Sequence, residues 1–182
     1  MSIIKHKAQR VAVLLDVQNM YHSAKNLYNA RVNFKEVLRS AVAERELVRA
    51  IGYVIRTESG EEKSFLEALV KIGIETKLKD LQIFPGGMKK ADWDVGMAVD
   101  AIRFAQNGSV NAIVLVTGDG DFIPLVEHLK SNTGTQVEVV AFGKNTSLKL
   151  KDAANDFLDL CDNPERYLLR ANPRRIYAKK TV

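Results

Sequence analysis

The stretch Ala112-Ile-Val-Leu-Val116 runs directly into Thr117-Gly-Asp-Gly-Asp-Phe122. The first five residues are all apolar and three of them are β-branched, which is typical of a strand that is buried on both faces. The second part places two carboxylates one glycine apart at the end of that strand. Asp121 is well placed to cap a following helix that has Pro124 in its first turn. Asp119 then lacks a structural role, and the glycines on either side of it indicate unusual backbone angles or a close approach.

The same kind of pattern extends outward from this stretch in both directions. Val11–Leu15 is a second wholly apolar run, and Asp16 follows it immediately. Further strands are expected at 47–55, 74–84 (as one or two less buried strands), 136–141 and near 155–160, and helices at 18–28, 33–42, 61–72, 92–106 and 122–130. Strands that alternate with helices predict an α/β fold with a mainly parallel sheet covered by helices on both faces.

Composition narrows the class of protein. The 182 residues fit one domain, and Cys161 is the only cysteine, so an internal disulfide is excluded and a reducing, cytoplasmic setting is expected. The first ten residues lack the apolar core of a signal peptide, and the absence of 18 continuous apolar residues argues against a membrane span. The three histidines lack ligand spacing and are interpreted as structural, which disfavours zinc.

Positive charge is concentrated near the C-terminus. The net charge is +5, and residues 166–180 carry six Lys or Arg residues and no acid. This segment is either a solvated tail or a source of RNA affinity, with Tyr167 and Tyr177 available to stack on bases.

The acidic residues fall where an open α/β sheet binds its ligands, at the carboxyl ends of the strands. Asp16 ends the first strand, Asp119 and Asp121 follow the strand at 112–116, and Asp94 starts the helix before it. Each could simply cap a helix. Together they would repel one another unless a cation neutralised them, and an all-carboxylate set suits Mg²⁺ or Mn²⁺. Two such ions about 4 Å apart can activate water and stabilise the leaving oxygen of a phosphodiester.

Asp100 does not fit this cluster. It follows Asp94 by six residues, about 120° around an ideal helix and roughly 9 Å along it, so the two cannot share one face. Asp100 therefore either supports the site from behind or pairs with a cation such as Arg103 or Lys90. Phosphate-loop, dinucleotide and nucleophile-elbow motifs are missing, and Gln18 stands where a phospho-aspartyl hydrolase would have its second Asp.

Four motifs in order resemble one family. They are Leu14-Leu-Asp-Val-Gln-Asn19, Asp94-Val-Gly-Met-Ala-Val-Asp100, Thr117-Gly-Asp-Gly-Asp-Phe122, and Ser147-Leu-Lys-Leu with Ala154-Asn-Asp-Phe157. This set looks like that of the NYN domains, relatives of the PIN-domain nucleases, and in particular their bacterial LabA-like branch. The resemblance covers about residues 10 to 160. It suggests an N-terminal extension at 1–9, an NYN domain at 10–162 and a basic tail at 163–182.

The resemblance implies a PIN-like, Rossmann-like three-layer α/β/α sandwich and a ribonuclease that depends on Mg²⁺ or Mn²⁺. It also implies roles for individual residues. The catalytic metal ligands would be Asp16, Asp94, Asp119 and Asp121, and the residues at the substrate would be Asn19, Lys90 and Thr117. Asp100 and Ser147 would both be supporting residues. Two departures occur, because Lys90 stands four rather than three residues before Asp94, and Asn155 replaces a common Asp. RNA is the implied partner, and a homodimer is left open. The alternative is a non-catalytic RNA-binding or regulatory module that has kept the acidic pocket.

Overall fold

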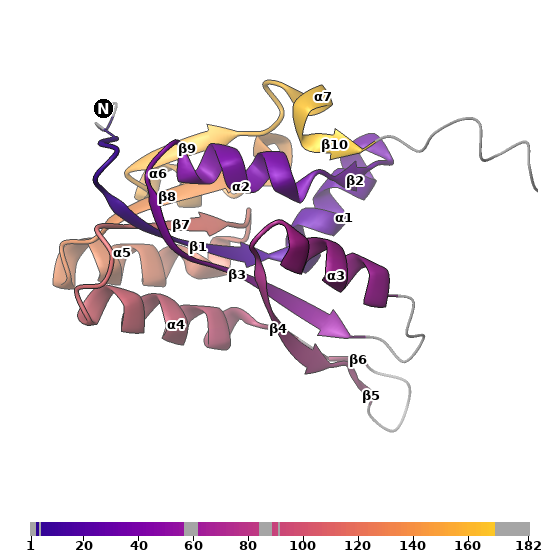
Figure 1. Cartoon of the computed structure of the whole chain (residues 1–182), viewed down its shortest axis with the longest axis horizontal. Coiled ribbons are helices and arrows are strands. Elements are labelled where there is room, and N and C mark those ends of the chain that lie inside the picture. The colour runs from indigo at the N-terminus through magenta and orange to yellow at the C-terminus, as the bar shows by residue number, and fades with distance from the viewer. Residues whose placement is uncertain (1–2, 4, 57–61, 84–88, 91, 170–182) are drawn as a thin grey trace, which may run out of the picture.

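A computed structural model of the chain describes residues 3, 5–56, 62–83, 89–90 and 92–169, with the backbone alone at 82–83 and 89–90 (Figure 1). Its centre is a six-stranded sheet with the order β4-β3-β1-β7-β8-β9, in which every neighbouring pair is parallel. The strands are β1 (Arg10–Asp16), β3 (Glu46–Arg56), β4 (Glu75–Asp80), β7 (Ala112–Val116), β8 (Gln136–Ala141) and β9 (Asp156–Asp159). The predicted parallel sheet is confirmed.

Helices cover both faces of this sheet, as Figure 1 shows. One face carries α1 (Val17–Tyr28), α2 (Phe34–Val42) and α3 (Lys63–Lys71), and the other carries α4 (Asp94–Gln106), α5 (Ile123–Asn132) and α6 (Leu148–Ala153). Strand β1 serves both layers, since Val11, Val13 and Leu15 pack with the first set while Ala12 and Leu14 pack with the second. A buried strand therefore reads as an unbroken apolar run, and the three-layer α/β/α sandwich is confirmed.

Short elements complete the described chain. They are β2 (Arg31–Val32), β5 (Gln82–Ile83), β6 (Lys89–Lys90), the 3₁₀ turns η1 (Gly120–Phe122) and η2 (Gly143–Asn145), α7 (Pro164–Tyr167) and β10 (Leu168–Leu169). Strand β10 pairs antiparallel with β2, which brings the start of the basic segment back onto the domain. Among the described residues, no helix has the length and apolar character needed to cross a bilayer.

The suggestion that Tyr167 stacks on RNA bases is wrong. Its side chain is buried, and its hydroxyl lies 3.1 Å from the Ser40 hydroxyl, so the ring packs in the core and cannot stack on an RNA base. The remainder of the basic segment, from 170 onward and including Tyr177, lies outside the described residues.

The order of the strands creates a switch point between β1 and β7. From β1 the chain moves outward through β3 to β4, and from β7 it moves in the opposite direction through β8 to β9. The connections at the carboxyl ends of β1 and β7 therefore diverge and leave a crevice, which is where doubly wound sheets bind their ligands. Asp16 and Thr117 stand at those two strand ends.

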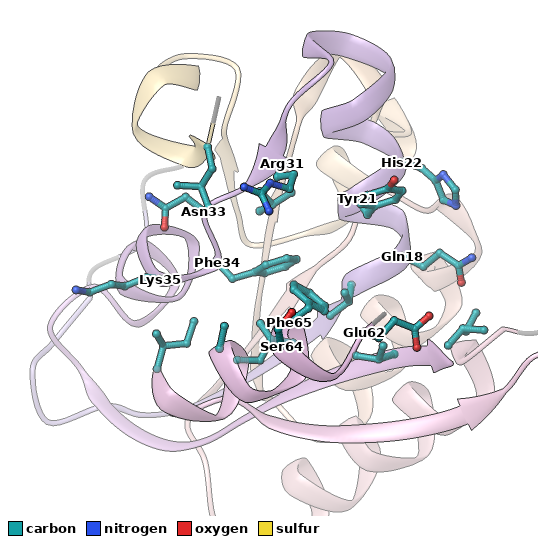
Figure 2. A pocket seen from close by; sticks show the side chains of 18 residues that line it. Gln18, Tyr21, His22, Arg31, Asn33, Phe34, Lys35, Glu62, Ser64 and Phe65 are labelled. Carbon is teal, nitrogen blue, oxygen red and sulfur yellow. The ribbon is translucent and has the colours of Figure 1, made fainter. Parts of the chain in front are cut away.

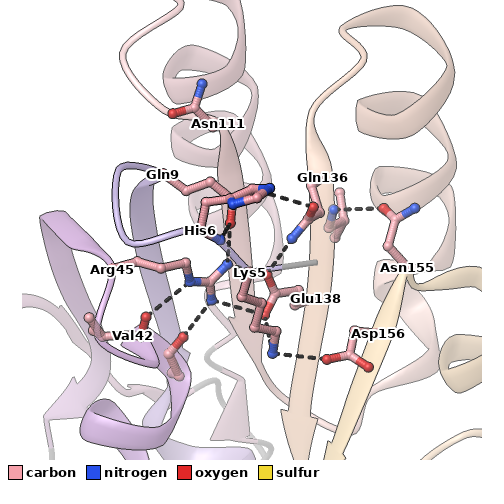
Figure 3. Close-up of polar contacts among 12 residues, drawn as sticks. Lys5, His6, Gln9, Val42, Arg45, Asn111, Gln136, Glu138, Asn155 and Asp156 are labelled. Atoms are coloured by element: carbon pink, nitrogen blue, oxygen red, sulfur yellow. Dashed lines mark hydrogen bonds and ion pairs between the residues drawn. The ribbon is translucent and has the colours of Figure 1, made fainter. Parts of the chain in front are cut away.

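The amino edge of the sheet is held by a buried ion pair that the sequence did not reveal (Figure 3). Arg45 and Glu138 are both almost fully buried, and Arg45 Nη2 donates to Glu138 Oε2 at 3.0 Å. Lys5 adds contacts of 2.9 Å to both Glu138 and Asp156. Burial alone would raise the pKa of Glu138, but the bonds from Arg45 and Lys5 outweigh it and hold that pKa below its usual value. This network stabilises the edge opposite the acids.

Asn155, one of the two departures from the family pattern, also lies at this amino edge. Its Oδ1 accepts from the backbone N–H of Val137 at 2.8 Å and ties β8 to the start of β9. An Asp at this position would therefore stand at the opposite end of the sheet from the acidic cluster, so the departure leaves the cluster unchanged.

Candidate metal centre

The turn after β7 is organised by Asp119. The Asp119 side chain accepts from the backbone N–H of Asp121 at 3.0 Å, and its own N–H donates to the Thr117 hydroxyl at 3.2 Å. Asp119 thus caps η1, while α5 follows with Phe122 at its cap position, no side-chain cap bond and a proline in its first turn. The expectation that Asp121 is the cap is wrong, because a 3₁₀ turn precedes the helix. The Asp121 side chain is exposed.

Gly118 is needed for a close approach and not for its backbone angles. Neither Gly118 nor Gly120 is among the glycines with positive φ. A Cβ on Gly118 would lie 2.9 Å from Thr146 Oγ1 and 3.0 Å from the Asn145 carbonyl oxygen. The loop before α6 therefore packs directly behind the acidic turn. Ser147 belongs to this loop, and its N–H donates to the Gly118 carbonyl at 3.1 Å.

Asp16 and Asn19 join the ends of β1 and β7. Asp16 Oδ1 accepts from the Asn19 N–H at 3.0 Å, and Asp16 Oδ2 accepts from the Thr117 hydroxyl at 3.2 Å. Asn19 Oδ1 in turn accepts from the Gly118 N–H at 2.9 Å. Burial, together with the charge of Asp119, raises the pKa of Asp16 above its ordinary value. Asp16 therefore caps α1 and faces the acidic turn as well.

Asp94 is placed by the residues around it at the start of α4. Trp93 Nε1 donates to the Val54 carbonyl at 3.0 Å, and the Trp93 ring lies so close over the first turn that a Cβ on Gly96 would meet it at 2.6 Å. Asp94 is the first residue of the helix. Burial, followed by the charges of Asp119 and Asp16, raises its pKa to about 6.

Three of the predicted carboxylates converge. Asp94, Asp119 and Asp121 each offer an oxygen, and these atoms all lie within 4.8 Å of one another. Asp16 is not in this three-oxygen group, but it lines the same cavity of about 200 Å³ as Asp94 and Asp119, and we call this the acid cavity. Among the described residues that line it, none is Lys or Arg. An all-oxygen, uncompensated donor set fits a hard divalent cation such as Mg²⁺ or Mn²⁺.

Thr117 and Asp100 stand behind the cavity. Thr117 is fully buried and its hydroxyl is used twice, so it holds the turn. Asp100 Oδ2 accepts from Tyr53 Oη and from Lys77 Nζ, both at 2.6 Å. Its ion-pair partner is therefore Lys77, and Arg103, one of the two cations that the sequence suggested, acts on it only through its charge. The side chain of Lys90 lies outside the described residues.

The acid cavity also has walls that the motifs did not point to. Gln18, His22 and Tyr53 line it, and His22 is exposed, contrary to its interpretation as a structural histidine. Two of them could have been predicted from the sequence. Gln18 and His22 are four residues apart on the helix that starts beside Asp16, so they share one face of it. Tyr53 is opposite Asp16 in the register of β3 and β1, which only the sheet order reveals.

A parallel α/β/α sandwich with an acidic crevice at its switch point defines a PIN-like protein. The NYN domain model matches residues 10–161, and the chain therefore belongs to the NYN domain family.

Comparisons with known proteins give two relatives in sequence and one similar solved structure. The low amplitude and bright protein LabA of Synechococcus elongatus is 25% identical over 171 residues, which span 86% of each chain. Protein MJ0482 of Methanocaldococcus jannaschii is 30% identical over 146 residues, 80% of this chain but only 53% of that protein. The crystal structure of VPA0982 from Vibrio parahaemolyticus, a protein of unknown function, superposes with a TM-score of 0.80 at 32% identity. That match covers 92% of this chain and all of the other.

Proposed function

We propose that this protein is a divalent-metal-dependent ribonuclease that hydrolyses RNA phosphodiesters. The observation that carries the proposal is the convergence of Asp94, Asp119 and Asp121 at the switch point of the sheet, beside a cavity with no Lys or Arg in its described lining. Membership of the NYN family supports the choice of reaction, because these domains are related to PIN nucleases. The positive net charge of the chain favours a polyanionic substrate.

The residues proposed to hold Mg²⁺ or Mn²⁺ are Asp94, Asp119 and Asp121, with Asp16 as a fourth carboxylate on the same cavity wall. A bound divalent cation lowers the pKa of a water molecule and offsets the negative charge of a phosphodiester. Without a cation, mutual repulsion and burial work against full ionisation of the four acids, as the raised pKa values of Asp16 and Asp94 indicate.

The chain's own polar groups would keep this arrangement rigid. The hydrogen bonds of Asp16 and Asn19 fix β1 against the turn after β7, so the carboxylates are positioned before substrate arrives. Asn19 uses its Oδ1 for Gly118, and its Nδ2 makes no hydrogen bond with the described residues. That amide group is therefore available to donate to a phosphate oxygen at the cavity.

The test is cleavage of a labelled single-stranded RNA by purified protein with Mn²⁺ or Mg²⁺, against Asp119→Asn and a control variant. Asn keeps the oxygen that caps η1 and removes only the charge, so the fold is expected to survive. Loss of a metal ligand should lower the rate by at least about 100-fold, the upper range seen for residues that only support ligands. Asp152→Asn removes an exposed acid from α6 and should leave cleavage unchanged.

One result would contradict the proposal. If wild-type protein cleaves no single-stranded RNA with either metal, and Asp119→Asn binds RNA as tightly as wild type, the protein is a non-catalytic RNA-binding or regulatory module.

A further inference from the structure

A second and larger cavity adjoins the acid cavity on the face of the sheet covered by α1, α2 and α3 (Figure 2). Its volume is about 820 Å³. That value lies in the upper part of the roughly 300–1,000 Å³ range of small-molecule sites. We call it the aromatic groove, defined by Tyr21, His22, Phe34 and Phe65 in its lining, with the basic residues Arg31 and Lys35 also part of it.

The two cavities share part of their walls. Gln18, His22 and Ile55 line both of them. Gln18 and His22 are one turn apart on α1, so a single helix face runs from the acids into the groove. A long ligand with one group at the carboxylates could therefore place its neighbouring groups in the aromatic groove.

The lining of the groove offers accessible aromatic rings from two separate helices. Tyr21 projects from α1 with 44% of its surface exposed, and the half-buried Phe65 of α3 packs its ring against the buried Phe34 of α2 at a centroid distance of 5.9 Å (Figure 2). The Tyr21 and His22 rings are 5.5 Å apart and nearly perpendicular. Aromatic side chains in a groove of this kind are what unpaired nucleic-acid bases stack on, whatever their sequence.

Two cations accompany these rings. Arg31 on β2 and Lys35 on α2 are exposed, and neither makes an ion pair or a side-chain hydrogen bond with any described residue. Other exposed lysines of the described chain, such as Lys71 and Lys149, also lack a carboxylate partner, so it is the position of Arg31 and Lys35 beside the rings that matters. Positive charge without an internal partner, beside stacking surfaces, complements a phosphate backbone.

We propose that the aromatic groove binds unpaired bases of the RNA strand whose reacting phosphodiester lies at the acid cavity. The choice of RNA as the occupant rests on the proposed ribonuclease function. Arg31 and Lys35 contact phosphates of the same strand. The groove selects single-stranded RNA, because a base within a duplex is stacked on its neighbours and cannot present its face to Tyr21 or Phe65.

Steady-state cleavage of a single-stranded RNA oligonucleotide by the full-length protein tests the groove. Tyr21→Ala and Lys35→Ala are each expected to raise KM with kcat unchanged, because they remove binding and not chemistry. The stacking lost with Tyr21 corresponds to an increase in KM of about fivefold to 150-fold. Arg39→Ala is the matched control, since Arg39 lies one turn beyond Lys35 on α2 and outside the groove, with a side chain that is 74% exposed. It should leave KM unchanged.

Photo-crosslinking of a 4-thiouridine RNA to wild-type protein without divalent metal provides a readout that does not need turnover. Crosslinks are expected in α1, the β2–α2 segment and α3. Cleavage with unchanged KM in both variants, or crosslinks that lie elsewhere, would overturn the groove and leave the ribonuclease proposal intact. Absence of cleavage would refute the ribonuclease, while the crosslinks would still decide the groove.

The same experiments separate other occupants of the groove. If Tyr21→Ala converts a dimer to a monomer in solution and leaves KM unchanged, the groove is an interface between two copies of the chain, and the proposal is wrong. If single-stranded DNA of the same sequence competes as well as RNA, the assignment of RNA as the preferred ligand is overturned.

Discussion

Replacing Asp94 with Asn is expected to stabilise the metal-free protein at pH 8 and to destabilise it once Mn²⁺ is present. The first half follows from the pKa of Asp94, which burial and the charges of Asp119 and Asp16 raise from 3.8 to about 6. A carboxyl group with a higher pKa in the folded state binds more protons when folded, so its ionisation costs stability. The cost is absent below pH 3.8, grows between pH 3.8 and about 6, and is constant above that.

The size of this effect can be worked out from the same values. A rise from 3.8 to about 6 corresponds to at most about 3 kcal/mol, and because the Asp94 carboxylate is only partly buried, solvent screening reduces this to about 1 kcal/mol. For a chain of this length, 1 kcal/mol shifts Tm by about 2–4 °C. Asp94→Asn should therefore melt about 2–4 °C above wild type at pH 8 in the presence of a chelator. The difference should shrink as the pH falls from 6 toward 4.

Addition of Mn²⁺ should reverse the order of the two proteins. A ligand at 100 times its Kd stabilises the state it binds by about 2.7 kcal/mol, and the Asn variant has one anionic ligand fewer with which to gain it. Thermal melts at pH 5 and pH 8, with and without Mn²⁺, give four Tm values for each protein. Glu127→Gln, an exposed position on α5, is the control for loss of one negative charge. The reasoning is refuted if Asp94→Asn is no more stable than wild type at pH 8 without metal. It is also refuted if the difference in Tm between the two metal-free proteins is the same at pH 5 and pH 8.

Two further predictions concern the scaffold. Arg45→Met should destabilise the protein by about 3 kcal/mol in urea denaturation, because Glu138 loses its main partner, and Arg45→Met with Glu138→Leu should recover most of the loss. A double variant that is as unstable as the single one would contradict this account. Gly118→Ala should cost about 1–3 kcal/mol and weaken Mn²⁺-induced stabilisation, because the new methyl group displaces the loop at 145–147 from the acidic turn. If Tm and the Mn²⁺-induced rise in Tm are both unchanged, the loop accommodates the methyl group without loss of stability, and this account is wrong.

The fold was predictable because its strands are buried on both faces. Runs such as Val11–Leu15 carry that information locally, since an apolar residue is required at every position and not at alternate ones. Contacts between distant segments were not predictable in this way. The pattern Asn33-Phe-Lys-Glu36 is typical of a capping box, in which the two residues bond to each other's backbone N–H. Asn33 does accept from the Glu36 N–H, but the Glu36 carboxylate pairs with Arg166 at 3.0 Å, and the Asn33 N–H donates to the Tyr167 carbonyl instead. Arg45 and Glu138 likewise meet only because β3 and β8 lie in one sheet.

The roles of Asp119 and Asp121 show where local reasoning fails within the site itself. Either acid could cap a helix that starts near Phe122, and the pattern alone favoured the one nearer the helix. The 3₁₀ turn and the hydroxyl of Thr117 decide otherwise, and they place the cap on the residue that also lines the acid cavity. Asp119 therefore has two separable properties, an oxygen that accepts a backbone bond and a charge that faces the cavity. Asn retains the first and lacks the second, so Asp119→Asn distinguishes a role in metal binding from a role in folding, whereas Asp119→Ala would remove both together.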